Sequence, residues 1–178
     1  TSTVDISTYL QDAIDAVQSD RTTGAVYIPS GQFRVESLIT CAEGVSLRGA
    51  GYMASDVIVA HTGVAFDYTP ASYTESGITF ADFSIRGSSA SAPTNDDLIQ
   101  VGNCTWMHFH RMRFRNTNGS CVRLMSQALH LGFDGCILES FAQYGIEVTA
   151  LGSLMLLNRM QVNANAVNGI ALLGVLAQ

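Results

Sequence analysis

Short apolar runs alternate with polar positions along most of the chain, and they return at a fixed spacing. Met112, Cys136 and Met160 are equally spaced along the chain. The same spacing relates four further sets: Phe114, Leu138 and Val162; Met107, Leu131 and Met155; Phe109, Phe133 and Leu157; Val122, Ile146 and Ile170. A regular repeat of about two dozen positions is typical of a solenoid, in which each repeat buries its apolar face against its neighbours. The sequence therefore predicts five apolar columns that face one continuous core.

Each repeat contains three short bursts in which alternate residues are apolar. In one repeat these are Leu129-Leu131-Phe133, Cys136-Leu138 and Ile146-Val148, and the alternation slips by one residue at Asp134-Gly135. Three strands per coil of about 24 residues predict an all-β, right-handed parallel β-helix. A leucine-rich repeat is excluded because its consensus is missing, and a coil this short cannot form a four-stranded propeller blade.

An earlier and longer coil fits the same scheme once an insertion is allowed. Phe83 and Ile85 precede Met112 and Phe114 by more than one regular coil, and the polar segment 88–97 supplies the surplus. The coils thus extend toward the N-terminus.

The N-terminal segment has the pattern of a helix instead. Residues 5–18 place Ile6, Leu10, Ala13, Ile14 and Val17 on one stripe, and Asp5 precedes them as a helix cap. We expect a segment 1–24 with a capping helix, followed by coils over residues 25–178. Because the last apolar coil lacks a polar cap, we expect the solenoid to continue beyond Gln178 or to be covered by another chain.

The composition argues against several classes of partner and site. The net charge is −6, Lys is absent, and all nine basic residues are Arg, which argues against a nucleic-acid partner. The longest apolar run, 170–177, is too short for a membrane span, which needs roughly 20 residues. Cys41, Cys104, Cys121 and Cys136 lack the close spacing of zinc sites, and we expect buried free thiols.

The order of the N-terminal motifs resembles that of a known superfamily. The amphipathic helix is followed by GAVYIPSGQFRV and then by EGVSLRGAG, Glu43 to Gly51. This arrangement is similar to the opening of the pectate-lyase-like β-helices, particularly the bacteriophage tailspike and polysaccharide depolymerase branch. The resemblance covers residues 5 to about 60 by motif. It implies that Ile6, Leu10 and Ile14 cap the tube and that Leu47 to Gly51 form a bend.

The resemblance also implies a function. We expect a viral tailspike-like protein that binds, and in its enzymatic form cleaves, bacterial surface polysaccharide as a hydrolase or lyase. Its partners would be the polysaccharide, two further copies of the chain in a homotrimer, and other virion proteins. It would be located in the virion or, alternatively, be a secreted bacterial protein. The other hypothesis is a non-enzymatic structural β-helix of a virion. Asp96-Asp97 is the one adjacent acidic pair and sits in a polar loop, so we predict neither a metal nor a cofactor.

Residues between the apolar columns should face outward and stack from coil to coil. The three expected stacks are Arg86, Arg115, Glu139, Asn163; Ser84, Arg113, Ile137, Gln161; and Gln100, Arg123, Glu147, Ala171. One interpretation is ion pairing of Arg115 with Glu139 and of Arg123 with Glu147. The other is a sugar-binding groove, with Glu139 and Glu147 as candidate catalytic acids and Arg113, Arg115, Arg123 and Trp106 as substrate-binding residues.

Two further sets of residues each allow two interpretations. His110, Asp134 and Asn158 stack at the bend, where a structural hydrogen-bonded ladder is favoured over a proton relay. Trp106, His108, His130, Leu154 and Leu156 share one outward face. That face suits sugar stacking or an intersubunit contact, and its apolar outward residues favour the contact.

Overall fold

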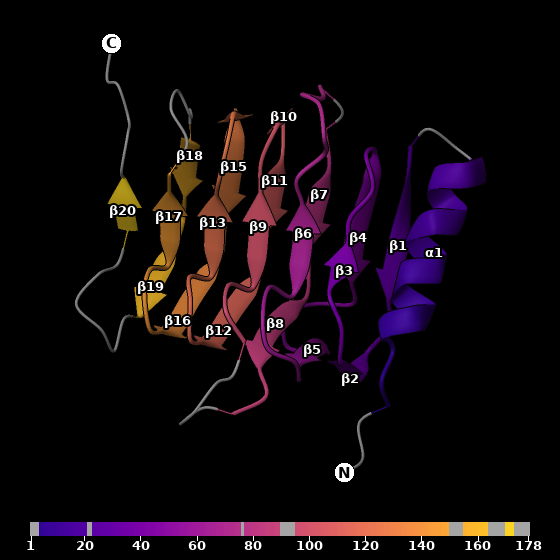
Figure 1. Ribbon diagram of the computed structural model, residues 1–178. Coiled ribbons are helices and arrows are strands. Elements are labelled where there is room, and N and C mark those ends of the chain that lie inside the picture. The colour runs from indigo at the N-terminus through magenta and orange to yellow at the C-terminus, as the bar shows by residue number, and fades with distance from the viewer. Residues whose placement is uncertain are drawn as a thin grey trace.

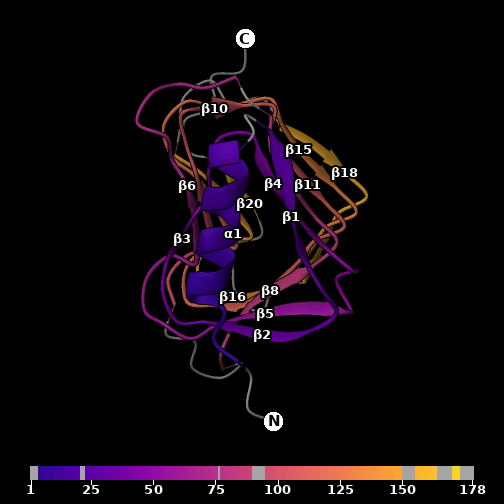
Figure 2. The ribbon, with the colours of Figure 1, turned by 90° about the vertical axis from the view of Figure 1, so that its right-hand side faces the viewer.

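The computed structural model describes residues 4–20, 23–75, 77–89, 95–149, 155–163 and 170–172, with side chains through residue 163. These residues form the predicted right-handed parallel β-helix, closed at its N-terminal end by one helix (Figure 1). Figure 2 looks along the tube, with α1 (Ser7–Asp20) lying across its end.

Three parallel sheets form the walls of the tube. Sheet 1 contains, in spatial order, β1 (Gly24–Ile28), β4 (Val45–Gly49), β7 (Thr79–Ala81), β11 (His108–His110), β15 (Leu131–Asp134) and β18 (Met155–Asn158). Sheet 2 contains β2 (Gly31–Val35), β5 (Ser55–Val59), β8 (Ser84–Gly87), β12 (Arg113–Thr117), β16 (Ile137–Phe141) and β19 (Gln161–Asn163). Sheet 3 contains β3 (Ile39–Thr40), β6 (Phe66–Tyr68), β9 (Ile99–Val101), β13 (Val122–Leu124), β17 (Ile146–Val148) and β20 (Ile170–Leu172). A fourth, two-stranded sheet pairs β10 (Cys104–Thr105) with β14 (Ala128–Leu129) at a corner.

The strand register confirms the predicted columns. Phe109 pairs with Phe133 and Phe133 with Leu157 in sheet 1. The corresponding pairs in the other sheets are Phe114–Leu138–Val162 and Val122–Ile146–Ile170. The earlier coil also fits, because Ile85 pairs with Phe114 despite the longer spacing. The inward side chains of these columns are fully buried in the middle coils, whereas Leu157 in the last described strand of sheet 1 is 41% exposed.

Aromatic rings stack along the inside of sheet 1. The Phe109 and Phe133 ring centroids lie 4.7 Å apart at 16°, and Phe80 stacks on the other side of Phe109 at 5.7 Å. Since adjacent strands lie about 4.8 Å apart, aromatic residues at the same position of successive strands place their rings directly over one another. The repeat in the sequence thus becomes continuous packing in the core.

Two local expectations need correction. The pattern predicts that Leu129 opens an inward burst, but Ala128 is buried and Leu129 only half-buried, because the chain turns at His130 with a left-handed φ of 54°. The resemblance implies a bend over Leu47 to Gly51, but β4 continues through Gly49, and the chain turns over residues 50–54 instead.

The helix covers the end of the core as predicted. Leu10 and Ile14 are buried against it, and Ile6 packs at its edge. Asp5 accepts hydrogen bonds from the backbone N–H and the hydroxyl of Ser7, at 3.0 and 2.7 Å, which satisfies a free donor of the first turn. These hydrogen bonds hold the pKa of the Asp5 carboxyl below its ordinary value.

All four cysteines are buried and free, as expected. In the part of the chain that the structure describes, no helix is long and apolar enough to cross a membrane.

Candidate functional site

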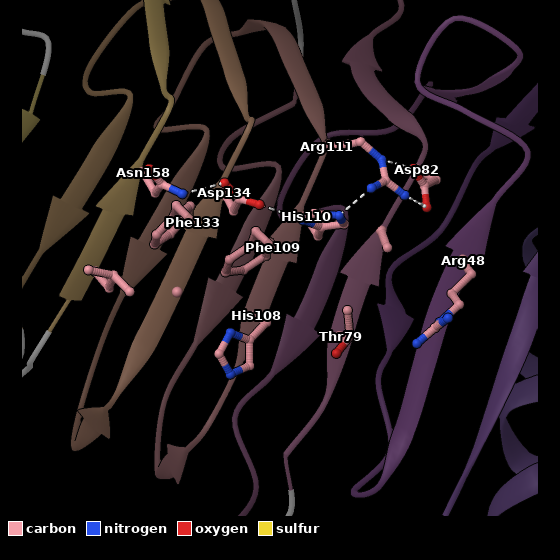
Figure 3. A pocket seen from close by; sticks show the side chains of 13 residues that line it. Arg48, Thr79, Asp82, His108, Phe109, His110, Arg111, Phe133, Asp134 and Asn158 are labelled. Carbon is pink, nitrogen blue, oxygen red and sulfur yellow. Dashed lines mark hydrogen bonds and ion pairs between the residues drawn. The ribbon is translucent and has the colours of Figure 1, made fainter.

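The outward side chains of sheet 1 line a groove of about 590 Å³ that crosses β4, β7, β11, β15 and β18 (Figure 3). We call it the sheet 1 groove. Two outward columns run along it: Arg48, Ala81, His110, Asp134, Asn158 and, beside them, Thr79, His108, Gly132, Leu156.

Two small residues create the hollow. Ala81 lies between Arg48 and His110 in the first column, so neither long side chain meets a large neighbour there. Gly132 follows His108 in the second column, and a Cβ atom at this position would lie 2.5 Å from His108 Nδ1. The His108 ring therefore lies over bare backbone, and any larger residue at position 132 would displace it.

One edge of the groove is a continuous hydrogen-bonded row at the bend. Arg111 donates to both carboxylate oxygens of Asp82, at 2.6 and 2.8 Å, and also contacts His110 Nε2. His110 Nδ1 lies 3.0 Å from Asp134, which accepts a further bond from Asn158 at 2.8 Å. The predicted structural ladder of His110, Asp134 and Asn158 is confirmed, and both ring nitrogens of His110 are engaged in it.

Arginines fix the charges of this row. Arg159 donates two hydrogen bonds to Asp134 Oδ1 and one to Oδ2, and this interaction holds the pKa of the Asp134 carboxyl below its ordinary value. The hydrogen bond to Asp82 likewise raises the pKa of Arg111. Each carboxylate of the row is therefore already paired with a cation.

Arg48 and His108 differ from the row. Among the described residues, neither side chain has a hydrogen-bond or ion-pair partner, and both project into the groove (Figure 3). In the figure Arg48 extends toward Thr79, away from the paired charges at the bend. Both side chains are free to contact a ligand.

The groove continues toward an exposed aromatic residue. A neighbouring hollow of about 150 Å³ shares His108, Gly132 and Leu156 with it and ends at Trp106. Trp106 is 53% exposed, and its ring stacks on His130 at 4.5 Å and 12°. His130 is in turn held by Thr105 Oγ1, 3.0 Å from its Nδ1. Trp106 thus presents a flat, fixed apolar face beside the polar groove.

The predicted catalytic residue Glu139 lies in β16 on the outside of sheet 2. Its carboxylate is bound by Arg113, with Nε at 2.9 Å and Nη2 at 2.8 Å. The expected partner Arg115 instead lies 3.5 Å from Asp56, which also binds Arg86 at 2.8 Å. The predicted pairing of Arg115 with Glu139 is wrong because arginine is long enough to reach diagonally past the residue directly opposite.

The second predicted acid, Glu147, lies in β17 on sheet 3 and is 9% exposed. It accepts hydrogen bonds from Ser120 Oγ at 2.7 Å and from Arg123 Nε at 2.9 Å, which confirms the predicted Arg123 pair. Arg123 also lies 3.1 Å from the buried Asp97.

The structure therefore distributes the predicted site residues over three faces. Glu139 lies with Arg113 and Arg115 on sheet 2, Glu147 lies with Arg123 on sheet 3, and Trp106 lies beside the sheet 1 groove. Within the described ranges, no group of three or more His, Cys, Asp or Glu side chains is placed to hold a metal ion. Leu154, predicted to share the face of Trp106, lies outside the described residues.

Sequence reasoning missed Arg48, Thr79, Asp82 and Arg111 as groove residues. The sequence placed Arg48 only in a bend motif, because its column does not follow the regular spacing of the later coils. The steps from Arg48 to its neighbour Ala81 and from Ala81 to His110 are both longer than a later coil, and they differ from each other. The alternation of β4, with Leu47 inside and Arg48 outside, was the signal that could have placed it.

Comparisons with known proteins agree with this architecture. A family model described as rhamnogalacturonase A/epimerase, pectate lyase-like, matches residues 1–171. Among solved structures, the chain is similar to the A-module of the mannuronan C-5 epimerase AlgE4 of Azotobacter vinelandii, at 16% identity and a TM-score of 0.67, covering 89% of this chain and 46% of that one. The AlgE6 A-module of the same organism gives 16% identity and a TM-score of 0.62 over 97% of this chain and 53% of that one.

A third similar structure is the catalytic unit of a GH87 α-1,3-glucanase from Streptomyces thermodiastaticus, at 19% identity and a TM-score of 0.54, covering 89% of this chain and 33% of that one. The chain thus spans about half the length of the epimerase modules and a third of the glucanase unit. A comparison with curated protein sequences finds no significant match. At these identities the likenesses establish a shared fold.

Proposed function

The chain belongs to the rhamnogalacturonase A/epimerase, pectate lyase-like family, and we propose that it binds a bacterial surface polysaccharide along the sheet 1 groove. The observation that carries the proposal is the groove itself, an open hollow of about 590 Å³ with the unpaired Arg48 and His108 inside it. Polar groups that converge on a concave surface are the usual composition of a ligand site.

The shape of the groove supports an extended ligand. It crosses five strands of one sheet, and successive strands lie about 4.8 Å apart, so its floor is a row of repeated positions instead of a single pit. Trp106 lies beside one end as a flat face, held in place by its stack on His130. A polymer of rings fits a site with both an aromatic face and polar side chains along its length.

Two solved structures with this fold are named for enzymes of polysaccharides, a mannuronan epimerase and an α-1,3-glucanase. The finer proposal is a viral tailspike-like protein, in the virion, that acts as a homotrimer together with other virion proteins. Its support is the order of the N-terminal motifs, from the capping helix through Glu43 to Gly51.

Cleavage of the bound polysaccharide is a separate proposal, with Glu139 and Glu147 as its acids. Two carboxyl groups that act together in a glycosidase lie roughly 5 to 9.5 Å apart. Glu139 and Glu147 lie on different sheets, and each is bound by an arginine. We therefore place binding first and test cleavage with the Glu139→Gln Glu147→Gln variant, by assaying reducing ends and unsaturated products.

The binding experiment uses an array of bacterial capsular polysaccharides and lipopolysaccharide O-chains. We compare the parent chain with Trp106→Ala and with the control Tyr9→Ala, which removes an exposed aromatic residue from α1. We expect the parent and Tyr9→Ala to bind the same glycans and Trp106→Ala to bind them roughly tenfold more weakly. No binding to any glycan by the parent, or equal binding by all three proteins, would contradict a ligand site at the groove.

A structural, non-enzymatic β-helix of a virion is the second candidate. The observation that favours it is the apolar surface beside the groove, where Leu156 is 71% exposed and Trp106 is 53% exposed. Exposed apolar side chains gathered on one face are typical of a contact between subunits.

A further inference from the structure

We propose that the free edge of β1, at the capped end of the tube, is a docking site for a β-strand of another polypeptide. The strand that fits this edge has apolar side chains at alternate positions and basic residues beside them. The inference concerns a surface outside the sheet 1 groove, so it stands or falls independently of the proposed function.

Each of the three walls begins at the capped end with a strand that has a neighbouring strand on one side only, and the chain itself supplies partners to two of these edges. In sheet 2, the Arg34 N–H donates to Val4 O at 3.0 Å, and its carbonyl accepts from the Ile6 N–H at 2.8 Å. In sheet 3, the side chain of Gln11 replaces a strand: its Oε1 accepts from the Thr40 N–H at 2.9 Å, and its Nε2 donates to Thr40 O at 3.0 Å. Both edges are thus satisfied at these positions.

The edge of sheet 1 has no such partner. Gly24 donates its N–H to Gly44 O at 3.0 Å, on the side of β4, and the parallel register continues this pattern at every second residue. Ala25 and Tyr27 lie between these positions and direct their N–H and C=O groups to the other side of β1. In the part of the chain that the structure describes, these groups have no hydrogen-bond partner. Unpaired groups along a strand edge are a template for another strand.

An apolar groove of about 230 Å³ runs along this edge. Ile6, Leu10 and Ala13 of α1 line it together with the successive residues 26–29 of β1 and the following turn. The helix and β1 lie side by side at the capped end (Figure 1, Figure 2). A strand added to β1 would direct every second side chain toward α1 and into this groove. Backbone hydrogen bonds would supply affinity, and the groove would select apolar side chains.

The charge of the capped end favours a basic partner. Residues 4–20 contain Asp5, Asp12, Asp15 and Asp20 and no basic residue, and the last three of these lie exposed on α1. An acidic strand would be repelled by these carboxylates, whereas basic residues that flank the apolar ones would be attracted to them. The occupant is therefore an amphipathic, basic strand, which extends sheet 1 by one strand.

The probe is the synthetic peptide acetyl-RVSVSIR-amide, in which apolar and polar residues alternate between two arginines. The control peptide has the same sequence with N-methylated apolar residues, which keeps the side chains and removes the N–H donors of one edge. Adding the probe to the folded chain should shift the backbone N–H resonances of Ala25 and Tyr27 and slow their exchange with solvent. We expect the N-methylated peptide to bind at least about tenfold more weakly.

Two variants test the site from the side of the chain. Ala13→Leu fills the groove with an apolar side chain, and the matched control Ala16→Leu makes the same change at an exposed position of α1. We expect Ala13→Leu to bind the probe about tenfold more weakly and Ala16→Leu to bind it as the parent does. Ala25→Pro removes one free donor of the edge and should also weaken binding while the chain stays folded, because proline is tolerated where the strand N–H faces solvent.

Equal affinity for the two peptides, or equal affinity of Ala13→Leu and the parent, would overturn the proposal. The absence of binding at a probe concentration of about 1 mM would do the same. If the N–H groups of Ala25 and Tyr27 became protected without the probe, and more so at higher protein concentration, a second copy would occupy the edge. That result would overturn the assignment to another polypeptide.

Discussion

At the scale of the residue, the groove exists because two small residues leave space between larger side chains. Ala81 and Gly132 interrupt the two outward columns of sheet 1, and the larger Arg48, His108 and His110 surround the space. Gly49, one residue after Arg48, is small for another reason: a Cβ atom there would lie 2.3 Å from the backbone oxygen of Asp82. One glycine shapes the ligand surface and the other lets two coils approach.

The pair Gly49→Ala and Gly132→Ala separates these two roles. Gly49→Ala should lower the free energy of unfolding by about 1 to 3 kcal/mol, because the new methyl group meets rigid backbone and the two coils must move apart. Gly132→Ala should change it by less than about 0.5 kcal/mol, because the atom it meets belongs to the exposed His108 ring, which can rotate. Urea unfolding gives the stability and the glycan array gives the binding, which only Gly132→Ala should weaken while the chain remains folded. Equal stability losses would show that His108 is as fixed as the backbone.

At the scale of the element, strands end where single residues adopt a left-handed backbone. Arg111, Gly135 and Arg159 follow the ends of β11, β15 and β18, with φ values of 48°, 64° and 49°. Two of the three are arginines, whose side chains reach back to acids of the preceding coil. The corner is thus stabilised by ion pairs at the same positions where the backbone turns, and this places the charged row along the edge of the groove.

The helix α1 should contribute to stability chiefly through its buried stripe. Ile14 is 1% exposed and lies over the end of the core, so Ile14→Ala should lower the free energy of unfolding by about 2 to 5 kcal/mol. Asp5→Ala, which removes the N-terminal capping residue of α1, should lower the free energy of unfolding by about 1 kcal/mol. The matched control Ala16→Gly tests helix propensity alone and should cost at most about 1 kcal/mol. If Ile14→Ala left the urea midpoint unchanged, the helix would not act as the cap of the tube.

The cysteines in the coils should be unreactive while the chain is folded. Burial raises the pKa of Cys104 to about 12 and of Cys136 to about 11, and it also raises the pKa of Cys41 and Cys121. An ordinary thiol has a pKa of about 8.5, so above that pH the unfolded chain loses protons that the folded chain keeps. The thiols therefore stabilise the fold fully below pH of about 8.5, and this contribution falls as pH rises through the range between the unfolded and folded pKa values.

Two measurements check this expectation. A thiol reagent at pH 8 should label none of the four cysteines in the native chain and all four in urea. Urea unfolding at pH 8 and pH 10.5 should show lower stability at the higher pH, and the difference should shrink in Cys104→Ala. Rapid native labelling of any one cysteine would show that its coil opens readily.

At the scale of the whole molecule, the tube offers several outer faces, and they differ in charge and polarity. Sheets 2 and 3 carry ion pairs between arginines and the acids Asp56, Glu139, Asp97 and Glu147. Sheet 1 carries the groove and, beside it, exposed apolar side chains. A ligand or a second subunit is therefore expected on sheet 1, and the two possibilities compete for the same face.

The solution mass distinguishes these possibilities. If the face of Leu156 is an intersubunit contact, the parent chain should be a trimer, and Leu156→Asp should lower its mass toward that of a monomer, because a charge would be buried without a partner. The control Met53→Asp changes a residue that is 77% exposed beside sheet 2, and it should leave the mass unchanged. A monomeric parent that is indistinguishable from Leu156→Asp would exclude the contact and leave the face available to a glycan.

The fold could be predicted from the amino-acid sequence alone, because in a solenoid every coil repeats one pattern of inward residues. The spacing of Phe109 and Phe133 was enough to predict that their side chains lie on adjacent strands, and the stripe of Leu10 and Ile14 was enough to predict the cap. Insertions between the early coils broke that spacing, so the column from Arg48 to His110 could not be recognised. Which carboxylate each arginine reaches depends on the packed coils, since these side chains extend past their nearest neighbour. The packing thereby left Arg48 as the described arginine without a carboxylate partner.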